Sequence, residues 1–167
     1  MRDEETAEIA VRAAITGHLV FSTLHTNDAP GSITRLQDMG VEDYLVADSL
    51  VGVIAQRLLK RLCPACKKKS KITQKEMEIL GLDEQISIFR PCGCQFCNGT
   101  GYKGRIAVHE IMYVNENIRN AIVQEKNLEK LREIAKQKGM VTLWNSCKSF
   151  VLKGITSIRE LLTLNMQ

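Results

Sequence analysis

One stretch near the N-terminus decides the fold: Leu19-Val20-Phe21-Ser22-Thr23-Leu24-His25-Thr26-Asn27-Asp28-Ala29-Pro30. Its first half, Leu19–Leu24, is almost continuously apolar, and this pattern predicts a short strand at the centre of a sheet covered by helices. The polar residues after it predict a loop, in which Asn27 or Asp28 caps the next helix and Pro30 fits the first turn.

Helices are predicted on both sides of this strand. Asp3 is the expected N-cap of a helix that runs to about Ile15 and ends at Gly17, and the helix after the loop ends near Gly40. The order helix, strand, loop, helix is typical of an α/β fold. Because a central strand needs neighbours on both sides and the sequence up to Leu62 offers no other central strand, we expect its partners upstream of Met1 or in another chain.

Apolar spacing and capping residues predict the remaining elements. Residues 42–59 have the spacing of a helical region, residues 104–112 have the pattern of a strand, and Thr73 begins a short helix that ends at Leu80 and Gly81. Four further helices are predicted to start at Asn115, Asn127, Thr142 and Ser157.

Composition limits the class of protein. The 167 residues are 44% hydrophobic and 25% charged, which is typical of a globular chain and excludes disorder, collagen and coiled coil as the main state. No apolar stretch reaches the roughly 18 residues of a membrane span, and the charged N-terminus does not resemble a secretory signal. We therefore expect a cytoplasmic protein, in which paired cysteines more often hold metal than form disulfides.

The cysteines form a recognisable pattern. Cys63-Pro64-Ala65-Cys66 and Cys94-Gln95-Phe96-Cys97 are two C-x2-C pairs separated by 27 residues. Two such pairs can supply the four thiolates of a tetrahedral zinc site, and Gly99 and Gly101 allow backbone amides to turn toward the sulfurs. Because four thiolates leave no open position for water, the predicted Zn²⁺ is structural and not catalytic.

The other two cysteines have no predicted metal role. Cys92 could replace Cys94, but its spacing from Cys97 is not that of a C-x2-C pair, so we expect a bystander. Cys147 lies on an apolar helical face and is expected to be a buried small hydrophobe.

Positive charge is concentrated in one segment. The chain has a net charge of +4, but residues 57–75 contain eight lysines and arginines and no acid. The run could compensate the negative zinc–thiolate site or be a solvated face, or it could bind anionic lipid or nucleic acid. We favour charge compensation or a solvated face over a binding surface. Nucleic acid is not expected, because such sites usually interleave aromatic side chains and only Phe89 and Phe96 lie nearby.

His25 is a candidate ligand-binding residue. It follows the predicted central strand, and in open α/β sheets ligands bind beyond the carboxyl ends of the strands. A histidine followed by Thr26, Asn27 and Asp28 could contact a phosphate, although a purely structural role is the alternative for any single histidine.

Several segments together resemble a known family. They are Arg2-Asp3-Glu4-Glu5-Thr6, residues 16–29, Ala55-Gln56-Arg57-Leu58, residues 62–66, and Cys94 to Arg105 with its Asn98-Gly99-Thr100-Gly101-Tyr102-Lys103-Gly104-Arg105 tail. The sequence is similar to the secretion ATPase superfamily, and more narrowly to the assembly ATPases of type II secretion, type IV pili and DNA-uptake pseudopili. The tetracysteine element favours these over the retraction ATPases.

The resemblance implies a fold and a domain organisation. It implies an α/β fragment of a P-loop, RecA-like ATPase domain with a four-cysteine zinc subdomain and a C-terminal helical subdomain. The expected boundaries are 1–62 for part of the ATPase core, 63–104 for the zinc subdomain, and 105–167 for a strand with the C-terminal helices.

The resemblance also implies an activity and its residues. It implies a homo-hexameric ATPase on the cytoplasmic face of the inner membrane, which uses ATP and Mg²⁺ to drive pilus or pseudopilus assembly through a membrane platform and its assembly proteins. His25 is implied to act near the γ-phosphate, both in catalysis and in nucleotide binding. Arg2, in the tail of the family's Asp box, is implied to be catalytic, and Arg57 to bind nucleotide.

One motif of the family is missing. The sequence contains no G-x-x-x-x-G-K-[ST], the loop that holds the phosphates. We therefore expect the chain to be a C-terminal part that is inactive alone. The alternative is a stand-alone zinc-knuckle adaptor that binds protein, anionic lipid or nucleic acid through its basic face. Such an adaptor has no use for an unpartnered apolar strand at Leu19–Leu24.

Overall fold

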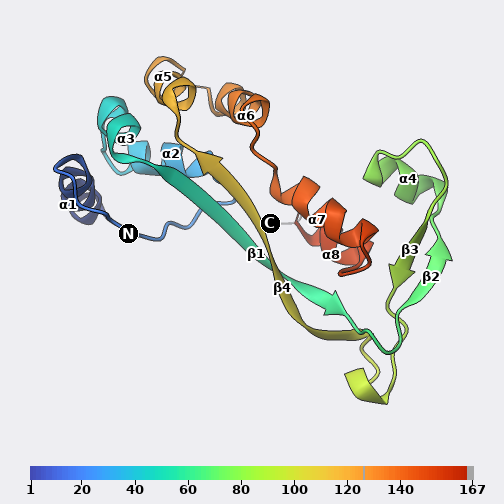
Figure 1. Ribbon diagram of the computed structural model, residues 1–167. Coiled ribbons are helices and arrows are strands. Elements are labelled where there is room, and N and C mark those ends of the chain that lie inside the picture. Colours follow the sequence, from blue (N-terminus) through green and yellow to red (C-terminus); the bar gives the residue numbers. More distant parts are fainter. Residues whose placement is uncertain (126, 165–167) are drawn as a thin grey trace. The chain divides into compact units, whose positions relative to one another are not determined.

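The chain divides into two compact units. The computed structural model describes residues 1–125 and 127–164 (Figure 1). The first unit comprises Met1–Ala55 with Glu110–Thr142, and the second comprises Gln56–His109 with Leu143–Gln167. The predicted boundaries at residues 62 and 104 stay predictions.

The first unit is built from helices around one apolar core. They are α1 (Glu4–Ile15), α2 (Gly31–Asp38), α3 (Asp43–Ser49), α5 (Glu116–Gln124) and α6 (Leu128–Gln137). Buried apolar side chains from all five helices meet in one cluster: Ala7, Val11, Ile33, Leu36, Val46, Ile118, Ile122 and Leu131. The core thus joins helices from two distant parts of the sequence.

Capping residues fix the helix starts as predicted. The Asp3 carboxylate accepts a hydrogen bond from the Thr6 amide at 2.9 Å, and the Asn115 side chain accepts from Ile118 at 3.1 Å. Asn127 caps α6 in the same way, through the Glu129 amide at 2.9 Å. The predicted starts of α1, α5 and α6 are therefore confirmed.

The predicted strand at Leu19–Leu24 is wrong for this chain. Residues 18–26, all within the described part, belong to no helix or strand. Leu19 and Phe21 are 79% and 88% exposed. A strand exists only where a second strand accepts its hydrogen bonds, and the described residues provide none here.

The predicted helical region 42–59 is only half correct. Its first part forms α3, but residues from Gly52 onward form strand β1 (Gly52–Leu62). The exposure of β1 alternates along most of its length, with Val53, Ala55 and Arg57 more covered than their neighbours. A segment that satisfies both the helical and the alternating period is assigned by its pairing, and β1 pairs with β4 (Tyr102–Tyr113).

The second unit contains strands, short helices and the cysteine segment. Strand β4 extends the predicted strand 104–112 at both ends, and Figure 1 shows it running opposite to β1. A short antiparallel hairpin, β2 (Lys68–Lys71) with β3 (Ser87–Arg90), was not predicted. The helical elements are α4 (Gln74–Leu80), the 3-10 turn η1 (Gln95–Cys97), α7 (Leu143–Leu152) and α8 (Ile158–Thr163). The predicted starts of α7 and α8 are confirmed.

Helix α4 begins and ends where its sequence predicts. The Thr73 hydroxyl accepts a hydrogen bond from the Glu76 amide while the Glu76 carboxylate accepts one from the Thr73 amide. Gly81 ends the helix in the left-handed conformation, at φ 54°. Glu76 also pairs with Arg90 of β3 at 2.8 Å, so α4 is fastened to the hairpin.

The residues before and within α8 cover the end of β1. The Thr156 hydroxyl donates to the Lys60 carbonyl at 2.7 Å, and the Glu160 carboxylate accepts from the Lys60 amide at 2.8 Å. The Leu62 amide donates to the Ile155 carbonyl at 2.8 Å. These groups replace a third strand along this edge.

None of the helices in the described part of the chain has both the length and the apolar character of a membrane span.

Candidate functional site

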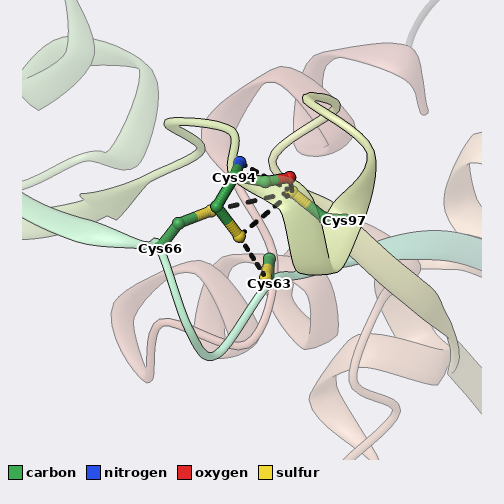
Figure 2. A group of neighbouring side chains, drawn as sticks. All are labelled: Cys63, Cys66, Cys94 and Cys97. Carbon is green, nitrogen blue, oxygen red and sulfur yellow. Dashed lines mark hydrogen bonds between the residues drawn. The ribbon is translucent and has the colours of Figure 1, made fainter.

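Four cysteine sulfurs converge in the second unit. Cys63 and Cys66 lie in the turn after β1. Cys94 immediately precedes η1, and Cys97 is the last residue of η1 (Figure 2). All four sulfurs lie within 4.8 Å of one another. The Sγ–Sγ distances are 3.9 Å for Cys63–Cys94, 3.8 Å for Cys66–Cys97 and 3.7 Å for Cys94–Cys97. These four are the residues that the spacing predicted.

The sulfur geometry fits a tetrahedral metal site. Zn–S bonds of about 2.3 Å place the sulfurs of a regular tetrahedron about 3.8 Å apart. These three Sγ–Sγ distances, 3.7–3.9 Å, lie on this value, and all six cysteines are free thiols and not disulfides. The arrangement can therefore hold a metal ion of the size and preference of Zn²⁺.

Backbone amides supplement the thiols. The Gly93 amide donates to Cys66 Sγ at 3.3 Å, and the amides of Cys94 and Gly101 each donate to Cys97 Sγ at 3.2 Å. Burial acts to raise the pKa of the Cys97 thiol, but these two amides and the hydrogen bonds with the Cys94 and Cys66 thiols together outweigh it and lower that pKa to about 6. In contrast, burial raises the pKa of the Cys66 thiol to about 11, so the amides favour the thiolate most at Cys97.

Glycine is required where the chain turns onto the sulfurs. Gly101 has φ +76°, and a Cβ there would lie 2.5 Å from Pro91 Cβ. The Gly101 carbonyl accepts from the Cys63 amide at 3.0 Å, which ties the two cysteine segments together. Gly101 is therefore needed because the backbone at this position lies too close to Pro91 to leave room for a side chain.

The remaining cysteines lie outside the group. Cys92 is exposed and is not among the four converging sulfurs. Cys147 is fully buried on α7, and burial raises the pKa of its thiol to about 12. It is therefore a protonated core side chain, as its apolar helical face predicted.

Some cations of the basic run have structural partners. Lys67 Nζ donates to the Gly154 carbonyl at 2.7 Å and lies 4.5 Å from the centre of the Phe89 ring. Lys69 Nζ lies 5.5 Å from the same ring. Lys68 and Lys71 of β2 are exposed. Apart from Arg57 and Lys67, which are half-buried, the cations of the run are exposed.

His25 lies in the first unit on the connection between α1 and α2. The residue is exposed, and the loop that follows it is held by several hydrogen bonds. The Asp28 carboxylate accepts from the Gly31 amide at 2.9 Å and pairs with Arg132 of α6 at 2.7 Å. The Ala29 amide donates to the Glu110 carboxylate of β4 at 2.8 Å.

Glu110 and Arg132 were not found by sequence reasoning. They lie 81 and 104 residues from their loop partners. Neither has a local motif or helical spacing that points to such a role. The only signal was an acidic residue at an expected apolar strand position, because Glu110 is 3% exposed in β4.

The other two candidate residues, Arg2 and Arg57, lie in different units. Arg2 is exposed immediately before α1, next to the Met1 ammonium group, which donates to the Thr23 carbonyl at 2.9 Å. Arg57 is half-buried on β1 in the second unit. Their roles stay predictions.

Comparisons with known proteins agree on one family. The family described as "Type II/IV secretion system protein" matches residues 1–163. The type IV pilus assembly ATPase PilB of Thermus thermophilus is 46% identical over all of this chain and 19% of its own length. Type II secretion system protein E of Dickeya dadantii is 40% identical over all of this chain and 33% of its own length.

Solved structures give the same fold. The pilus retraction motor PilT with bound ADP superposes with a TM-score of 0.66 at 26% identity, covering 98% of this chain and 37% of PilT. The Legionella pneumophila ATPase DotB, at 20% identity and a TM-score of 0.64, shows the α/β fold alone.

The match covers only part of each relative. The chain spans between 19% and 34% of the length of the curated relatives. Within that span the likeness runs almost from end to end of the chain, and the four-cysteine cluster lies inside it. The chain belongs to the type II/IV secretion system protein family.

Proposed function

We propose that this chain is the C-terminal part of a hexameric ATPase that powers type II secretion or the assembly of a type IV pilus or pseudopilus. The single observation that carries the proposal is the family match over residues 1–163, with two type IV pilus assembly ATPases at 46% identity and a type II secretion system protein E at 40%. In this proposal the ATPase works on the cytoplasmic face of the inner membrane, with a membrane platform and assembly proteins as partners.

The residues present suggest which steps of ATP binding and hydrolysis this chain would contribute to the complete enzyme. The sequence has no G-x-x-x-x-G-K-[ST] loop, so the chain alone should neither bind ATP tightly nor hydrolyse it. In the complete enzyme that loop and Mg²⁺ would hold the phosphates. His25 would contact the γ-phosphate, Arg2 would support the chemistry, and Arg57 would bind nucleotide.

The role proposed for the cysteine cluster is structural zinc binding. Cys63, Cys66, Cys94 and Cys97 would hold Zn²⁺, which would cross-link the turn after β1 to the turn before β4. The sulfur spacing and the amides directed at Cys97 support this assignment. Four thiolates fill the coordination sphere, so no reaction step is assigned to the metal.

A chimera tests the ATPase proposal. The corresponding C-terminal part of Thermus thermophilus PilB, which is 46% identical, would be replaced by this chain, and steady-state ATP hydrolysis would be measured. We expect the chimera to hydrolyse ATP and His25→Ala to lower kcat at least tenfold, while Cys92→Ser leaves it unchanged. A folded, hexameric chimera without activity would contradict the proposal.

The isolated chain and its metal provide two further tests. Calorimetry with ATP should show no binding tighter than micromolar, and sub-micromolar affinity would contradict the proposal that this chain alone does not bind ATP tightly. Elemental analysis should find one zinc per chain, lost in Cys94→Ser and retained in Cys92→Ser. The reverse result would show that the ligand assignment is wrong.

Besides the favoured charge compensation or solvated face, the charge of the second unit supports a second proposed role for the basic run, contact with anionic lipid. This unit carries 14 lysines and arginines against five aspartates and glutamates, whereas the first unit carries nine against 14. We expect the chain to bind vesicles of phosphatidylglycerol and not of phosphatidylcholine, with Lys68→Glu/Lys71→Glu weakening binding and Lys136→Glu of the first unit leaving it unchanged. Equal binding by both variants would contradict this contact.

A further inference from the structure

The loop that carries His25 is fixed from parts of the chain that lie far away in sequence. Residues 18–26 form no helix or strand, so the preceding segment provides no regular framework for the loop. The hydrogen bonds that do hold it come from β4 and from α6. All of these residues belong to the first unit.

Glu110 holds the loop through its backbone. Its Oε1 accepts from the Ala29 amide at 2.8 Å, and the residue is 3% exposed. A buried carboxylate is costly unless it is hydrogen-bonded, and a bond from a backbone amide fixes the chain more closely than a bond from a flexible side chain. Ala29 itself is fully buried, so the loop cannot shift here without disturbing the core.

Arg132 holds the loop through Asp28. Its Nε donates to Asp28 Oδ2 at 2.7 Å, while Oδ1 of the same carboxylate accepts from the Gly31 amide at 2.9 Å. Arg132 also pairs with Glu129 on its own helix, which limits the guanidinium to one orientation. The Arg132 and Asp28 side chains are only 28% and 22% exposed. The pair is thus shielded enough to hold its geometry.

Hydrogen bonds between nearby residues of the turn also help to hold it. The Thr26 hydroxyl lies 3.1 Å from the Asp28 carbonyl, to which it donates, and 3.0 Å from the Ser32 hydroxyl. His25 is directly joined to this braced turn and is itself exposed. Its backbone position is therefore set by the turn, while its imidazole remains accessible to a ligand.

We propose that Glu110 and Arg132 are positioning residues, which hold the 26–31 turn so that His25 meets the terminal phosphate in the correct place. This inference rests on the proposed function. Neither side chain touches the nucleotide in this account. Each acts through the loop backbone, and a displacement of about 1 Å at a catalytic group can cost on the order of a hundredfold in rate.

Kinetics of the chimera described above test the inference. We expect Arg132→Leu and Glu110→Leu each to lower kcat about tenfold or more with little change in KM for ATP, because the phosphate loop still binds the nucleotide. Glu110→Gln keeps an acceptor for the Ala29 amide and should restore most of the activity. Lys130→Leu is the matched control, because it removes a cation of α6 and its ion pair to Glu125, and Lys130 makes no hydrogen bond or ion pair with the turn in the described part of the chain.

A double substitution shows whether the effect passes through His25. If it does, His25→Ala/Arg132→Leu should be no slower than His25→Ala alone. Additive losses would overturn the inference, as would an Arg132→Leu variant as active as Lys130→Leu. An inactive unsubstituted chimera would instead contradict the proposed function, so the two failures are distinguishable.

Amide hydrogen exchange in the 167-residue chain gives a readout independent of activity. We expect the Ala29 amide to exchange faster in Glu110→Leu and the Gly31 amide in Arg132→Leu, with α2 amides beyond the turn unchanged. Arg132 is partly exposed, so its variant should fold even where the buried Glu110→Leu does not. Unchanged exchange at Gly31 in folded Arg132→Leu would overturn the positioning role.

Discussion

Gly154 is the glycine of the second unit at which an added Cβ would make the shortest contact. It follows α7 with φ +66°, and a Cβ there would lie 2.2 Å from Phe89 Cδ2 and 2.8 Å from Cε2. Both residues belong to the second unit. Gly154→Ala should therefore weaken the contact between the end of α7 and the β2–β3 hairpin.

The expected cost has two parts. Placing an alanine in the left-handed region costs about 1–2 kcal/mol. The overlap with the ring must be relieved by moving Phe89 or the α7 end, and overpacking of this kind costs about 1–3 kcal/mol. A movement of Phe89 would also disturb its contact with Lys67, which lies over the ring at 4.5 Å and donates to the Gly154 carbonyl. We expect a total loss of about 2–5 kcal/mol in the free energy of unfolding.

Gly104→Ala is the matched control. Gly104 lies in the same unit with φ +74°, and no atom lies within 4 Å of the Cβ that it would gain. Only the backbone cost of about 1–2 kcal/mol should remain. Urea unfolding of both variants with saturating zinc can be followed through Trp144, the single tryptophan, which lies on α7.

A third variant isolates the clash. In the Gly154→Ala background, Phe89→Leu removes the ring atoms that meet the new methyl group and should cost less than it does in the unsubstituted chain. The reasoning is refuted if Gly154→Ala costs no more than Gly104→Ala, because the ring would then yield freely.

Three further perturbations follow from local contacts. Arg90 lowers the pKa of the Glu76 carboxyl to about 2, so the pair's stabilisation is present above pH 4.5 and lost as pH falls toward 2. NMR of α4 should show this loss at acid pH, and Glu76→Gln should remove the dependence. Asp3→Ala should cost α1 about 1 kcal/mol by urea unfolding, because the Thr6 amide loses its acceptor. Phe21→Ser should change stability in the isolated chain by less than about 0.5 kcal/mol, because the ring is 88% exposed.

Helix starts could be predicted because their causes are local. Asp3, Thr73, Asn115 and Asn127 each accept a hydrogen bond from an amide two or three residues away. Such a contact depends only on the next turn of chain, so the sequence contains all the information that it needs.

Strands could not be predicted with the same success, because pairing is non-local. Residues 19–24 have the apolar pattern of a central strand, but no strand forms without a partner. Residues 52–59 have apolar positions at helical spacing, but pairing with β4, some fifty residues later, makes them a strand. In both cases tertiary context outweighed the local pattern.

The same contrast divides the candidate sites. The four cysteines could be predicted because each C-x2-C pair brings two sulfurs together within one turn. Zn²⁺ prefers four tetrahedral ligands, so two such pairs are expected to converge on one site. The support of the His25 loop could not, because Glu110 and Arg132 have ordinary surroundings in the sequence and reach the loop only through the fold.

Residues 19–24 need a covering surface to bury their apolar side chains, whereas the turn after His25 is already held by hydrogen bonds within this chain. Leu19 and Phe21 leave most of their surface in water, and full burial of each side chain would contribute about 1.5–3 kcal/mol. Ordering the backbone costs about 1–2 kcal/mol per residue, so burial of these two side chains alone could not order the whole segment. Part of that cost is already met at its ends, since α1 precedes the segment and the turn after His25 is fixed. In the proposed ATPase, covering strands would therefore gain most of the burial energy without displacing His25, and Phe21→Ser should be costly in the chimera although it is neutral in the isolated chain.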